Sequence, residues 1–378
     1  MIDDARPVGG AQTYLTRLCA GTSAKGWWNG VVADELPAEQ LPGVEQLRTS
    51  APTRLATARL VLELEPDVVL LHTVDSPELA RMLTKQVRTL VFAHDYRNIS
   101  PGNLRFFQRS ERFCERGFGL RCLVKPYTER CNNRRPDRVL ESIARVRGWR
   151  SVLGEVDGVL CASERVAQLV RAFATEAAVS VVGYPIDVPD VPSPPASSRG
   201  GDVLYVGRTS PVKGIHHLVD AFARLAPTHP QSKLLVAGGP DLDSVHRRAV
   251  ECGIGHAVEL LGWLEPSALP AAYARARVLA MPSVWPEPYG MAGPEALAYG
   301  IPVVVSDVGG VRDWMDASFG ALVPPSDPAA LADALAALLD DAGAADAAGR
   351  AGHSFVSKSL TFDRHFERLA PLVAGVER

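Results

Sequence analysis

The sequence predicts an α/β protein with two doubly wound domains of parallel β-sheet. Short apolar runs rich in β-branched residues alternate with helix-length amphipathic segments along most of the chain, which is the pattern of βα repeats. A proline-rich stretch without apolar periodicity, residues 185–201, divides the chain into nearly equal halves. The length of 378 residues suits two domains better than one core.

Strands are expected wherever a short apolar run is bounded by turn residues. In the first half these runs are 66–72, 88–94, 157–163 and 178–184, and in the second half 202–208, 233–239, 277–283, 301–307 and 320–324. The segments 214–226 and 328–341 have the length and periodicity of helices. Each parallel crossover should be right-handed.

These elements predict four parts. An N-terminal domain covers 1–184 and contains a basic insertion at 100–136, a linker with five prolines covers 185–201, and a C-terminal domain covers 202–354. The remaining residues, 355–378, are predicted to form one C-terminal helix. This helix is expected to cross back to the first domain.

The start of the first domain does not fit this scheme. Only eight residues precede Gly9, and MIDDARPV is a poor strand sequence. Either the first domain lacks its usual first strand, or the chain begins downstream of its natural start. The sequence leaves both open.

Composition narrows the class of protein. The chain is 47% hydrophobic and 22% charged, has no run of eighteen apolar residues, and does not begin like a signal peptide. We therefore expect it in the cytoplasm, with the inner face of the membrane as a second location.

Charge is unevenly distributed. Residues 105–150 contain thirteen Arg or Lys and five Asp or Glu, although the whole chain has a net charge of −3. Such a region suits an anionic acceptor or a weak peripheral contact with a membrane, and it is also compatible with a solvated insertion. No nucleic-acid-binding motif accompanies it, so we expect no nucleic-acid partner.

Three cysteines lie in the same region. Cys114, Cys122 and Cys131 are separated by seven and eight residues, wider than the usual spacing of zinc ligands, and a fourth ligand is absent from the pattern. We therefore expect no metal site. The alternative to test is a metal site formed by these three cysteines.

The stretch WPEPYGMAGPEALAYG, residues 285–300, contains two carboxylates among apolar residues. Pro294 suits the first turn of a helix over 293–299, so the loop before it, with Tyr289, Gly290 and Met291, approaches a helix N-terminus. Backbone N–H groups there suit a diphosphate. Glu287 and Glu295 would repel phosphate and suit hydroxyl donors instead.

The motif EPYGMAGPE resembles the signature of the retaining glycosyltransferases of the group 1 family (family 4). GGAQTYLTRLCAG at the start is similar to the glycine loop and first helix of that family, VGRTSPVKGIHHLVDAF to the opening of its second domain, and VVGYPID to its hinge. The resemblance implies the GT-B architecture, in which two Rossmann-like domains face each other across a cleft.

The resemblance also implies roles for individual residues. Glu287 would contact the donor sugar and Glu295 the ribose, while Arg208 and Lys213 would hold the diphosphate. Gly9 and Gly10 would face the diphosphate from the other domain. Contacts to the base would come from the segment that contains Gly262, Trp263 and Leu264.

The acceptor side is assigned from the end of one predicted strand. His94 ends the strand 88–94 and is followed by Asp95 and Tyr96. The family often has a histidine here, so His94 is the candidate for hydrogen bonding near the reacting sugar. A structural role is the common alternative for a strand-end histidine.

The implied reaction is transfer of a sugar from a nucleotide diphosphate sugar to an acceptor hydroxyl with retention of configuration, without a metal or other cofactor. UDP-sugar is the first expectation and GDP-sugar the second, with a saccharide, a lipid-linked saccharide or a natural product as acceptor. Two alternatives stay open: a pseudo-glycosyltransferase that joins a cyclitol through nitrogen, and a non-catalytic nucleotide-binding or scaffolding protein. The oligomeric state is left open.

Overall fold

The structure is a computed structural model, and it describes residues 1–5, 9–189 and 194–375. The chain divides into two compact units. Unit 1 comprises Met1–Pro185 and Phe362–Arg378, and unit 2 comprises Ile186–Thr361. Each unit is described separately below.

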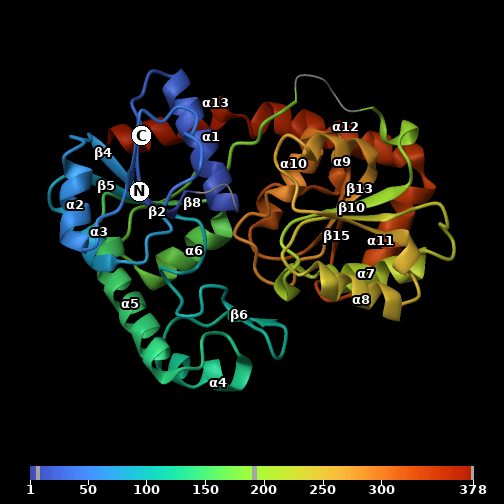
Figure 1. Ribbon diagram of the computed structural model, residues 1–378, viewed down its shortest axis with the longest axis horizontal. Coiled ribbons are helices and arrows are strands. Elements are labelled where there is room, and N and C mark those ends of the chain that lie inside the picture. The colour runs from blue at the N-terminus through green and yellow to red at the C-terminus, as the bar shows by residue number, and fades with distance from the viewer. Residues whose placement is uncertain (6–8, 190–193, 376–378) are drawn as a thin grey trace. The chain divides into compact units, whose positions relative to one another are not determined.

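Unit 1 is a parallel sheet with helices packed on it (Figure 1). The strand order is β3-β2-β1-β4-β5-β8-β9, and all of the pairings are parallel. The strands are β1 (Ile2–Asp4), β2 (Gly30–Glu35), β3 (Gln46–Thr49), β4 (Val68–His72), β5 (Arg88–Ala93), β8 (Gly158–Cys161) and β9 (Val179–Val181). The helices are α1 (Gly10–Ala24), α2 (Arg54–Leu62), α3 (Pro77–Thr84), α4 (Lys125–Glu129), α5 (Pro136–Glu155), α6 (Glu164–Phe173) and α13 (Phe362–Ala374).

The first strand is present, so the alternative in which the first domain lacks it is wrong. Ile2 pairs with Ala33 of β2 and with His72 of β4, and its side chain is fully buried. Three residues are too few to make an apolar run in the sequence, and the strand is defined by the neighbours that pair with it on both sides. Residues 6–8, which follow it, lie outside the described part of the chain.

Helices of unit 1 pack in two groups. Helices α2, α3 and α5 pack in series, as Figure 1 shows, and α1 packs against α13. The side chains of Ser76 and Thr53 cap α3 and α2 by accepting hydrogen bonds from N–H groups of the first turn. Since a capped helix start orients the preceding loop, the segments after β3 and β4 are fixed where they meet the sheet edge.

The basic insertion contains little regular structure. Strands β6 (Phe106–Phe107) and β7 (Arg112–Phe113) form a two-stranded antiparallel ribbon, followed by the 3₁₀ turn η1 (Leu120–Leu123) and by α4. Among all the described residues, including this insertion, no helix is long and apolar enough to cross a membrane.

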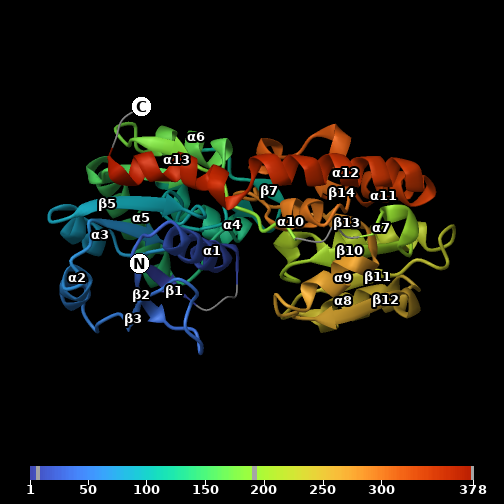
Figure 2. The same ribbon diagram turned by 90° about the horizontal axis from the view of Figure 1, so that it is seen from above.

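Unit 2 is a second parallel sheet with the order β12-β11-β10-β13-β14-β15. Figure 2 shows its helices on both sides of the strands. The strands are β10 (Asp202–Val206), β11 (Leu234–Ala237), β12 (Val258–Gly262), β13 (Ala276–Met281), β14 (Val303–Ser306) and β15 (Gly320–Val323). The helices are α7 (Ile215–Leu225), α8 (Leu242–Glu251), α9 (Leu269–Arg275), α10 (Ala292–Ala298), α11 (Pro328–Asp340) and α12 (Ala342–Ser359), and the 3₁₀ turns are η2 (Ala196–Ser198), η3 (Pro211–Lys213), η4 (Gly255–Ala257), η5 (Val311–Asp313) and η6 (Ala317–Phe319).

The segment of the predicted linker that follows residue 193 packs on unit 2. Arg199 is buried, and its guanidinium donates to the carbonyls of Pro194, Ala276 and Tyr299 at 2.7, 3.2 and 3.0 Å. Three carbonyl acceptors hold this segment against the start of β13 and the end of α10. Residues 190–193 lie outside the described part of the chain.

The final stretch forms two helices, so the expectation of one helix is wrong. Helix α12 ends at Ser359 and α13 begins at Phe362. The carbonyl of Leu360 accepts a hydrogen bond from the backbone N–H of Ile186 at 2.7 Å instead of continuing the helical ladder. The break coincides with the boundary between the two units after Thr361.

The predicted fold class is confirmed, and each apolar run predicted as a strand forms one. The runs of the first half became β4, β5, β8 and β9, and those of the second half became β10, β11, β13, β14 and β15. The strands that the sequence did not reveal are β1, β2, β3 and β12, together with the short ribbon β6–β7.

Candidate functional site

Apart from Gly9 and Gly10, which lie in unit 1, the residues predicted to bind the donor lie at one edge of the sheet of unit 2. Segments that follow the carboxyl ends of β10, β13 and β14 meet there. In a doubly wound sheet this edge is where ligands bind.

Glu287 is buried and paired. Its side chain is 4% exposed, and its Oε1 lies 2.6 Å from Nζ of Lys213, which is 22% exposed. The hydroxyl of Ser283 donates to the same oxygen at 2.5 Å. A buried carboxylate needs such partners, because removing a charge from water costs several kcal/mol. Two predicted site residues are therefore joined directly, and Ser283 is added to them.

Lys213 is positioned by an aromatic ring and by a glycine turn. The Lys213 ammonium lies 5.2 Å from the ring centroid of Trp285, in cation–π geometry. Lys213 ends the 3₁₀ turn η3 before Gly214, which has a φ of +71°. A Cβ on Gly214 would lie 1.9 Å from the carbonyl oxygen of Pro282, so only glycine allows this segment to approach the end of β13.

The backbone of Glu287 is fixed by the loop after β14. The N–H of Gly310 donates to the Glu287 carbonyl at 2.8 Å. Gly309 has a φ of +57°, and a Cβ there would lie 2.0 Å from the same carbonyl oxygen. The carboxylate of Glu287 is thus held by Lys213 and Ser283, and its backbone by this glycine pair.

Arg208 lies at the same edge with an exposed side chain. Its backbone carbonyl accepts a hydrogen bond of 2.5 Å from the hydroxyl of Tyr205. Burial raises the pKa of Tyr205 strongly, with Glu287 adding to the rise and Arg208 opposing it, so the phenol stays neutral and serves as a donor. Tyr205 fixes the turn that carries Arg208 and leaves the guanidinium accessible.

Helix α10 carries the second carboxylate. It begins at Ala292 with Met291 as its N-cap residue, slightly earlier than predicted, and Glu295 lies half-buried in the first turn. Gly290 has a φ of +81°, and a Cβ there would meet the end of the Met281 side chain at 2.8 Å.

Trp314 supports the loop before this helix. Its indole N–H donates to the carbonyl of Tyr289 at 2.7 Å, and a Cβ on Gly293 would lie 2.2 Å from its ring. Tyr289 itself is buried.

The predicted base-binding segment follows β12. Gly262 has a φ of +72°, and its carbonyl accepts from the N–H of Gly238 at 2.7 Å. Trp263 is 49% exposed and Leu264 half-buried. Gly238, which bonds to Gly262, is also close to the turn that contains Arg208, because a Cβ on Gly238 would lie 1.8 Å from the carbonyl oxygen of Gly207.

The acceptor-side candidates lie in unit 1, and His94 has two partners there. His94 is buried, its Nε2 lies 2.8 Å from Nδ1 of His72, and its Nδ1 lies 2.7 Å from the hydroxyl of Tyr184. Burial lowers the pKa of His94 to about 3, with Arg97 adding to the effect. Both ring nitrogens are engaged, which is the geometry of a structural histidine.

The remaining unit 1 candidates have separate environments. Asp95 pairs with Arg97, whose Nη2 lies 2.9 Å from the carboxylate, and Tyr96 is fully buried. Gly9 is the N-cap of α1 and Gly10 its first residue. A Cβ on Gly9 would approach the end of the Gln12 side chain at 2.9 Å, so the loop is close to its own helix.

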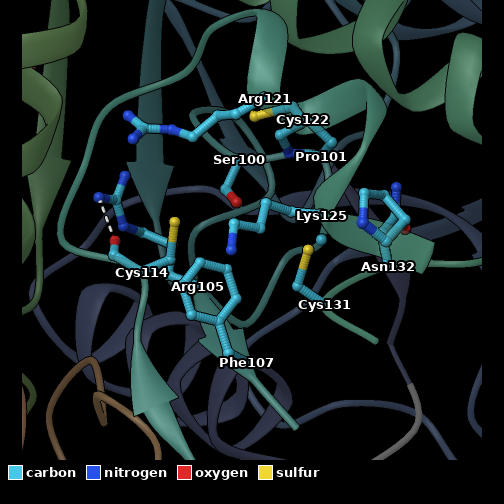
Figure 3. Close-up of a pocket in the computed structure, with 12 residues that line it drawn as sticks. Ser100, Pro101, Arg105, Phe107, Cys114, Arg121, Cys122, Lys125, Cys131 and Asn132 are labelled. Carbon is cyan, nitrogen blue, oxygen red and sulfur yellow. Dashed lines mark hydrogen bonds between the residues drawn. The ribbon is translucent and has the colours of Figure 1, made fainter. Parts of the chain in front are cut away.

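The three cysteines line a cavity of about 30 Å³ with Arg105, Lys125 and Asn132 (Figure 3). Figure 3 shows the sulfur atoms at separate sides of the cavity, with the Lys125 side chain pointing into it. Burial, with Cys114 and Cys122 adding to it, raises the pKa of Cys131 to about 11, and burial raises that of Cys114. Within the described residues, no group of three His, Cys, Asp or Glu is placed to hold a metal ion, so the metal alternative gains no support.

Sequence reasoning missed Ser283, Trp285, Gly309 and Trp314. A serine at the end of a strand and the Gly-Gly pair that follows β14 were visible as signals, since both occur where the parallel sheet presents its ligand edge. Their connection to Glu287 is made only in the fold.

Comparison with known proteins agrees with this geometry. The family described as glycosyl transferases group 1 matches residues 192–355. A glycogen synthase of Mycobacterium tuberculosis (strain CDC 1551 / Oshkosh) is 31% identical over 237 residues, which are 61% of this chain and 56% of that protein. The chain thus spans about half the length of this curated relative.

Solved structures resemble the whole chain. Sucrose-phosphate synthase from Thermosynechococcus elongatus has a TM-score of 0.75 and 21% identity, covering 99% of this chain and 95% of that one. Anabaena Alr3699/HepE, solved with UDP and glucose, has a TM-score of 0.72 and 17% identity, covering 99% and 98%.

The fold and the edge of unit 2 therefore define a protein of the GT-B class. The match to the group 1 glycosyltransferase family covers residues 192–355, in the second half of the chain.

Proposed function

We propose that the protein is a retaining glycosyltransferase that moves a sugar from a nucleoside diphosphate sugar to an acceptor hydroxyl. The observation that carries the proposal is the buried Lys213–Glu287 pair at the ligand edge of unit 2. It supplies a cation for a diphosphate and a carboxylate for sugar hydroxyls in one place.

The donor would be held by groups that converge on this edge. Glu287 accepts hydrogen bonds from sugar hydroxyls through its second oxygen, and Glu295 accepts from the ribose. Arg208 and Lys213 bind the diphosphate, with the N–H groups of Gly290 and Met291 beside them. Tyr289 keeps this loop in place, and Gly262, Trp263 and Leu264 border the base.

In the reaction, the bond between the anomeric carbon and the diphosphate oxygen breaks. A new bond forms from the acceptor oxygen to that carbon on the same face, and the hydroxyl proton passes to the departing diphosphate oxygen. Arg208 and Lys213 stabilise the negative charge that develops on the leaving group. Because two cations already do this, we propose that no metal or other cofactor is required.

UDP-sugar is the first donor to test, since a neighbour of the same fold was solved with UDP and glucose, and GDP-sugar is the second. The acceptor side would include His94, Asp95 and Tyr96, with a saccharide, lipid-linked saccharide or natural product as acceptor. All six cysteines are described and none forms a disulfide, which is typical of proteins from a reducing compartment. We therefore propose that the protein acts in the cytoplasm. Weak association with the membrane is a further possibility to test.

The deciding experiment is a screen of UDP-, GDP-, ADP- and dTDP-sugars by thermal shift and donor hydrolysis, with and without EDTA. One nucleotide class should stabilise the protein and be slowly hydrolysed, and EDTA should change neither result. Glu295→Ala should lose both effects, while Glu251→Ala, a 64% exposed glutamate at the end of α8, should keep them.

Each outcome has a consequence. Binding without hydrolysis or transfer favours the scaffolding alternative. Binding with transfer to an amine of a cyclitol favours the pseudo-glycosyltransferase. If no nucleotide sugar binds, the proposed function is wrong.

A further inference from the structure

Arg105, in the basic insertion, is a buried cation without a counter-charge. It is 6% exposed, and among the described residues no carboxylate forms an ion pair with it. Only its Nη2 has hydrogen-bond partners there, the carbonyl oxygens of Cys114 and Arg116 at 2.7 and 3.3 Å. Because a charge is costly to remove from water unless it is paired, Arg105 indicates a negative group that the described residues do not provide.

The backbone of Arg105 is also unusual. Its φ of +50° is in the left-handed region, which a residue with a side chain keeps only where its surroundings fix it. The carbonyl of Arg105 accepts a hydrogen bond from the N–H of Cys114 at 2.7 Å. Backbone and guanidinium are therefore both bound to Cys114, and the position of the charge is fixed.

Arg105 lines the cavity of about 30 Å³ that Figure 3 shows, and two further cations line it with Arg105. Arg121 belongs to η1 and Lys125 begins α4, so the three cations come from separate segments of the insertion. Figure 3 shows the Lys125 side chain pointing into the cavity. Among the described residues that line it, none is Asp or Glu.

The other two cations are only partly compensated. The Nη2 of Arg121 donates to the carbonyl of Gly117 at 3.0 Å, while its Nε is buried and has no hydrogen-bond partner in the described part of the chain. Lys125 is 38% exposed, pairs with Glu129 at 3.4 Å and lies 5.3 Å from the ring centroid of Phe107. Glu129 does not line the cavity, so a net positive charge remains around it.

Cys114 and Cys131 do not supply the missing negative charge. Burial raises the pKa of Cys131 to about 11 and raises that of Cys114, so both side chains are neutral thiols near pH 7. An S–H group is a weak hydrogen-bond donor, whereas a metal ion binds the thiolate. Neutral thiols beside three cations therefore suit an anion better than a metal ion.

The volume of the cavity restricts the ligand to a small ion. One water molecule needs about 10–15 Å³ of such space, so the cavity of about 30 Å³ holds an ion comparable in size to one or two water molecules. Sites for sugars and nucleotides are about tenfold larger or more. One wall is closely packed, because a Cβ on Gly102 would lie 1.9 Å from the carbonyl oxygen of Cys131.

We propose that this cavity binds a small inorganic anion, with chloride as the first candidate, and that the anion is the counter-ion of Arg105 and Arg121. It accepts hydrogen bonds from the two guanidinium groups and from the ammonium of Lys125. It thereby joins the loop before β6 to η1 and α4, in an insertion with little regular structure of its own. The site uses no residue of the proposed donor site, and the inference does not depend on the proposed function.

The test uses the full chain in sodium chloride, sodium bromide or sodium gluconate at one ionic strength, so that only the anion differs. Gluconate is too large to enter the cavity. In about 100 mM chloride, hydrogen exchange of peptides covering 104–108 and 114–126 should be about tenfold slower than in gluconate, the factor for a dissociation constant of about 10 mM. Bromide should act as chloride does, and peptides of unit 2 should not respond. Broadening of the chloride NMR line, reversed by bromide, measures binding directly.

Variants separate the cavity from general salt effects. Arg105→Met removes the buried charge and should abolish both responses to chloride. Lys125→Met, at a partly exposed position, should weaken chloride about tenfold, the effect of losing one hydrogen bond from a charged donor, and it carries the test if Arg105→Met does not fold. Arg134→Met removes an exposed arginine of the same insertion that does not line the cavity and should change nothing.

Four results would overturn the proposal. Gluconate could protect the peptides as well as chloride does, the chloride line could stay sharp, or Lys125→Met could keep the full response of the wild type. In the fourth, Zn²⁺ protects these peptides and chloride does not, which would favour the metal site of the three cysteines instead.

Discussion

Glu287 of unit 2 and His94 of unit 1 are both buried titratable residues beyond the end of a strand, but they are satisfied in opposite ways. Glu287 has a cation 2.6 Å away and a hydroxyl on the same oxygen. The side chain of His94 hydrogen bonds to His72 and Tyr184, and burial, with Arg97 adding to it, lowers its pKa to about 3. One residue is buried as an ion pair and the other as a neutral ring.

The difference shows why position at a strand end does not by itself assign a role. In a buried ion pair the carboxylate stays ionised, and its second oxygen can accept hydrogen bonds from a ligand. A neutral histidine with both nitrogens engaged contributes to packing. The two environments also predict opposite responses to mutation and to pH.

The largest effect is expected from removing the cation. Lys213→Met leaves Glu287 buried without its counter-ion and should lower the free energy of unfolding by about 3–5 kcal/mol. The double variant Lys213→Met/Glu287→Leu removes both charges and should recover most of this loss. Urea unfolding, with hydrogen exchange of unit 2 peptides as the local readout, measures both.

An exposed lysine provides the control. Lys233 lies 3.8 Å from Glu259 and is 52% exposed, so Lys233→Met should change stability by less than about 1 kcal/mol. A double variant no more stable than Lys213→Met would show that burial of an unpaired charge is not the cause.

The buried neutral histidines of unit 1 predict a pH dependence of the stability of that unit. Burial, the largest cause in each case, lowers the pKa of His94 to about 3 and that of His365 to about 4, below the unfolded value of about 6.5. Below pH 6.5 the unfolded chain binds more protons, so the free energy of unfolding falls as the pH drops, by about 2 kcal/mol per histidine at pH 5. Above pH 6.5 these groups contribute no slope.

Stability curves at pH 5.0 and 7.5 test this, with hydrogen exchange to separate the units. His94→Phe should remove about 2 kcal/mol of the pH dependence in unit 1. His246→Phe, on α8 of unit 2, should leave that slope unchanged. Equal slopes in wild type and His94→Phe would mean that His94 is not buried in its neutral form.

The glycines of unit 2 test how closely the loop after β14 must approach Glu287. Gly309→Ala would place a Cβ 2.0 Å from the Glu287 carbonyl oxygen, at a φ of +57°. A left-handed backbone conformation costs alanine about 1 kcal/mol relative to glycine. In Gly309→Ala the steric overlap adds about 1–3 kcal/mol to this cost. Gly253→Ala, with a φ of +74° and open space around it, has only the cost of the left-handed conformation.

The comparison of these two alanines isolates the steric contribution. Donor binding should weaken in Gly309→Ala, since the Glu287 backbone must move, and stay unchanged in Gly253→Ala. Similar loss of stability in both would show that left-handed strain, and not contact with Glu287, is the reason for glycine at position 309.

Much of the fold could be predicted because parallel strands are buried on both faces and appear as apolar runs, as in β5 and β14. Strands β3 and β12 have half-exposed residues throughout and made no such run, and β1 has three residues. Glu287 and Lys213 were found from a motif resemblance. Their pairing was not, because 74 residues separate them and only the sheet order brings them together.

A further effect is expected at Ser283, which sharpens the account of Glu287. Ser283→Ala removes one donor from a charged acceptor that keeps Lys213, so stability should fall by about 1.5–3 kcal/mol, at or below the lower end of the Lys213→Met effect. Ser318→Ala removes the same kind of bond, a serine hydroxyl to Asp316 at 2.6 Å, from the surface and should have no measurable effect.

Without Ser283 the carboxylate of Glu287 can rotate about its hydrogen bond to Lys213, so donor binding should weaken while Lys213 stays paired. If Ser283→Ala binds the donor as the wild type does, Lys213 alone orients Glu287, and the serine contributes only to the stability of the buried pair.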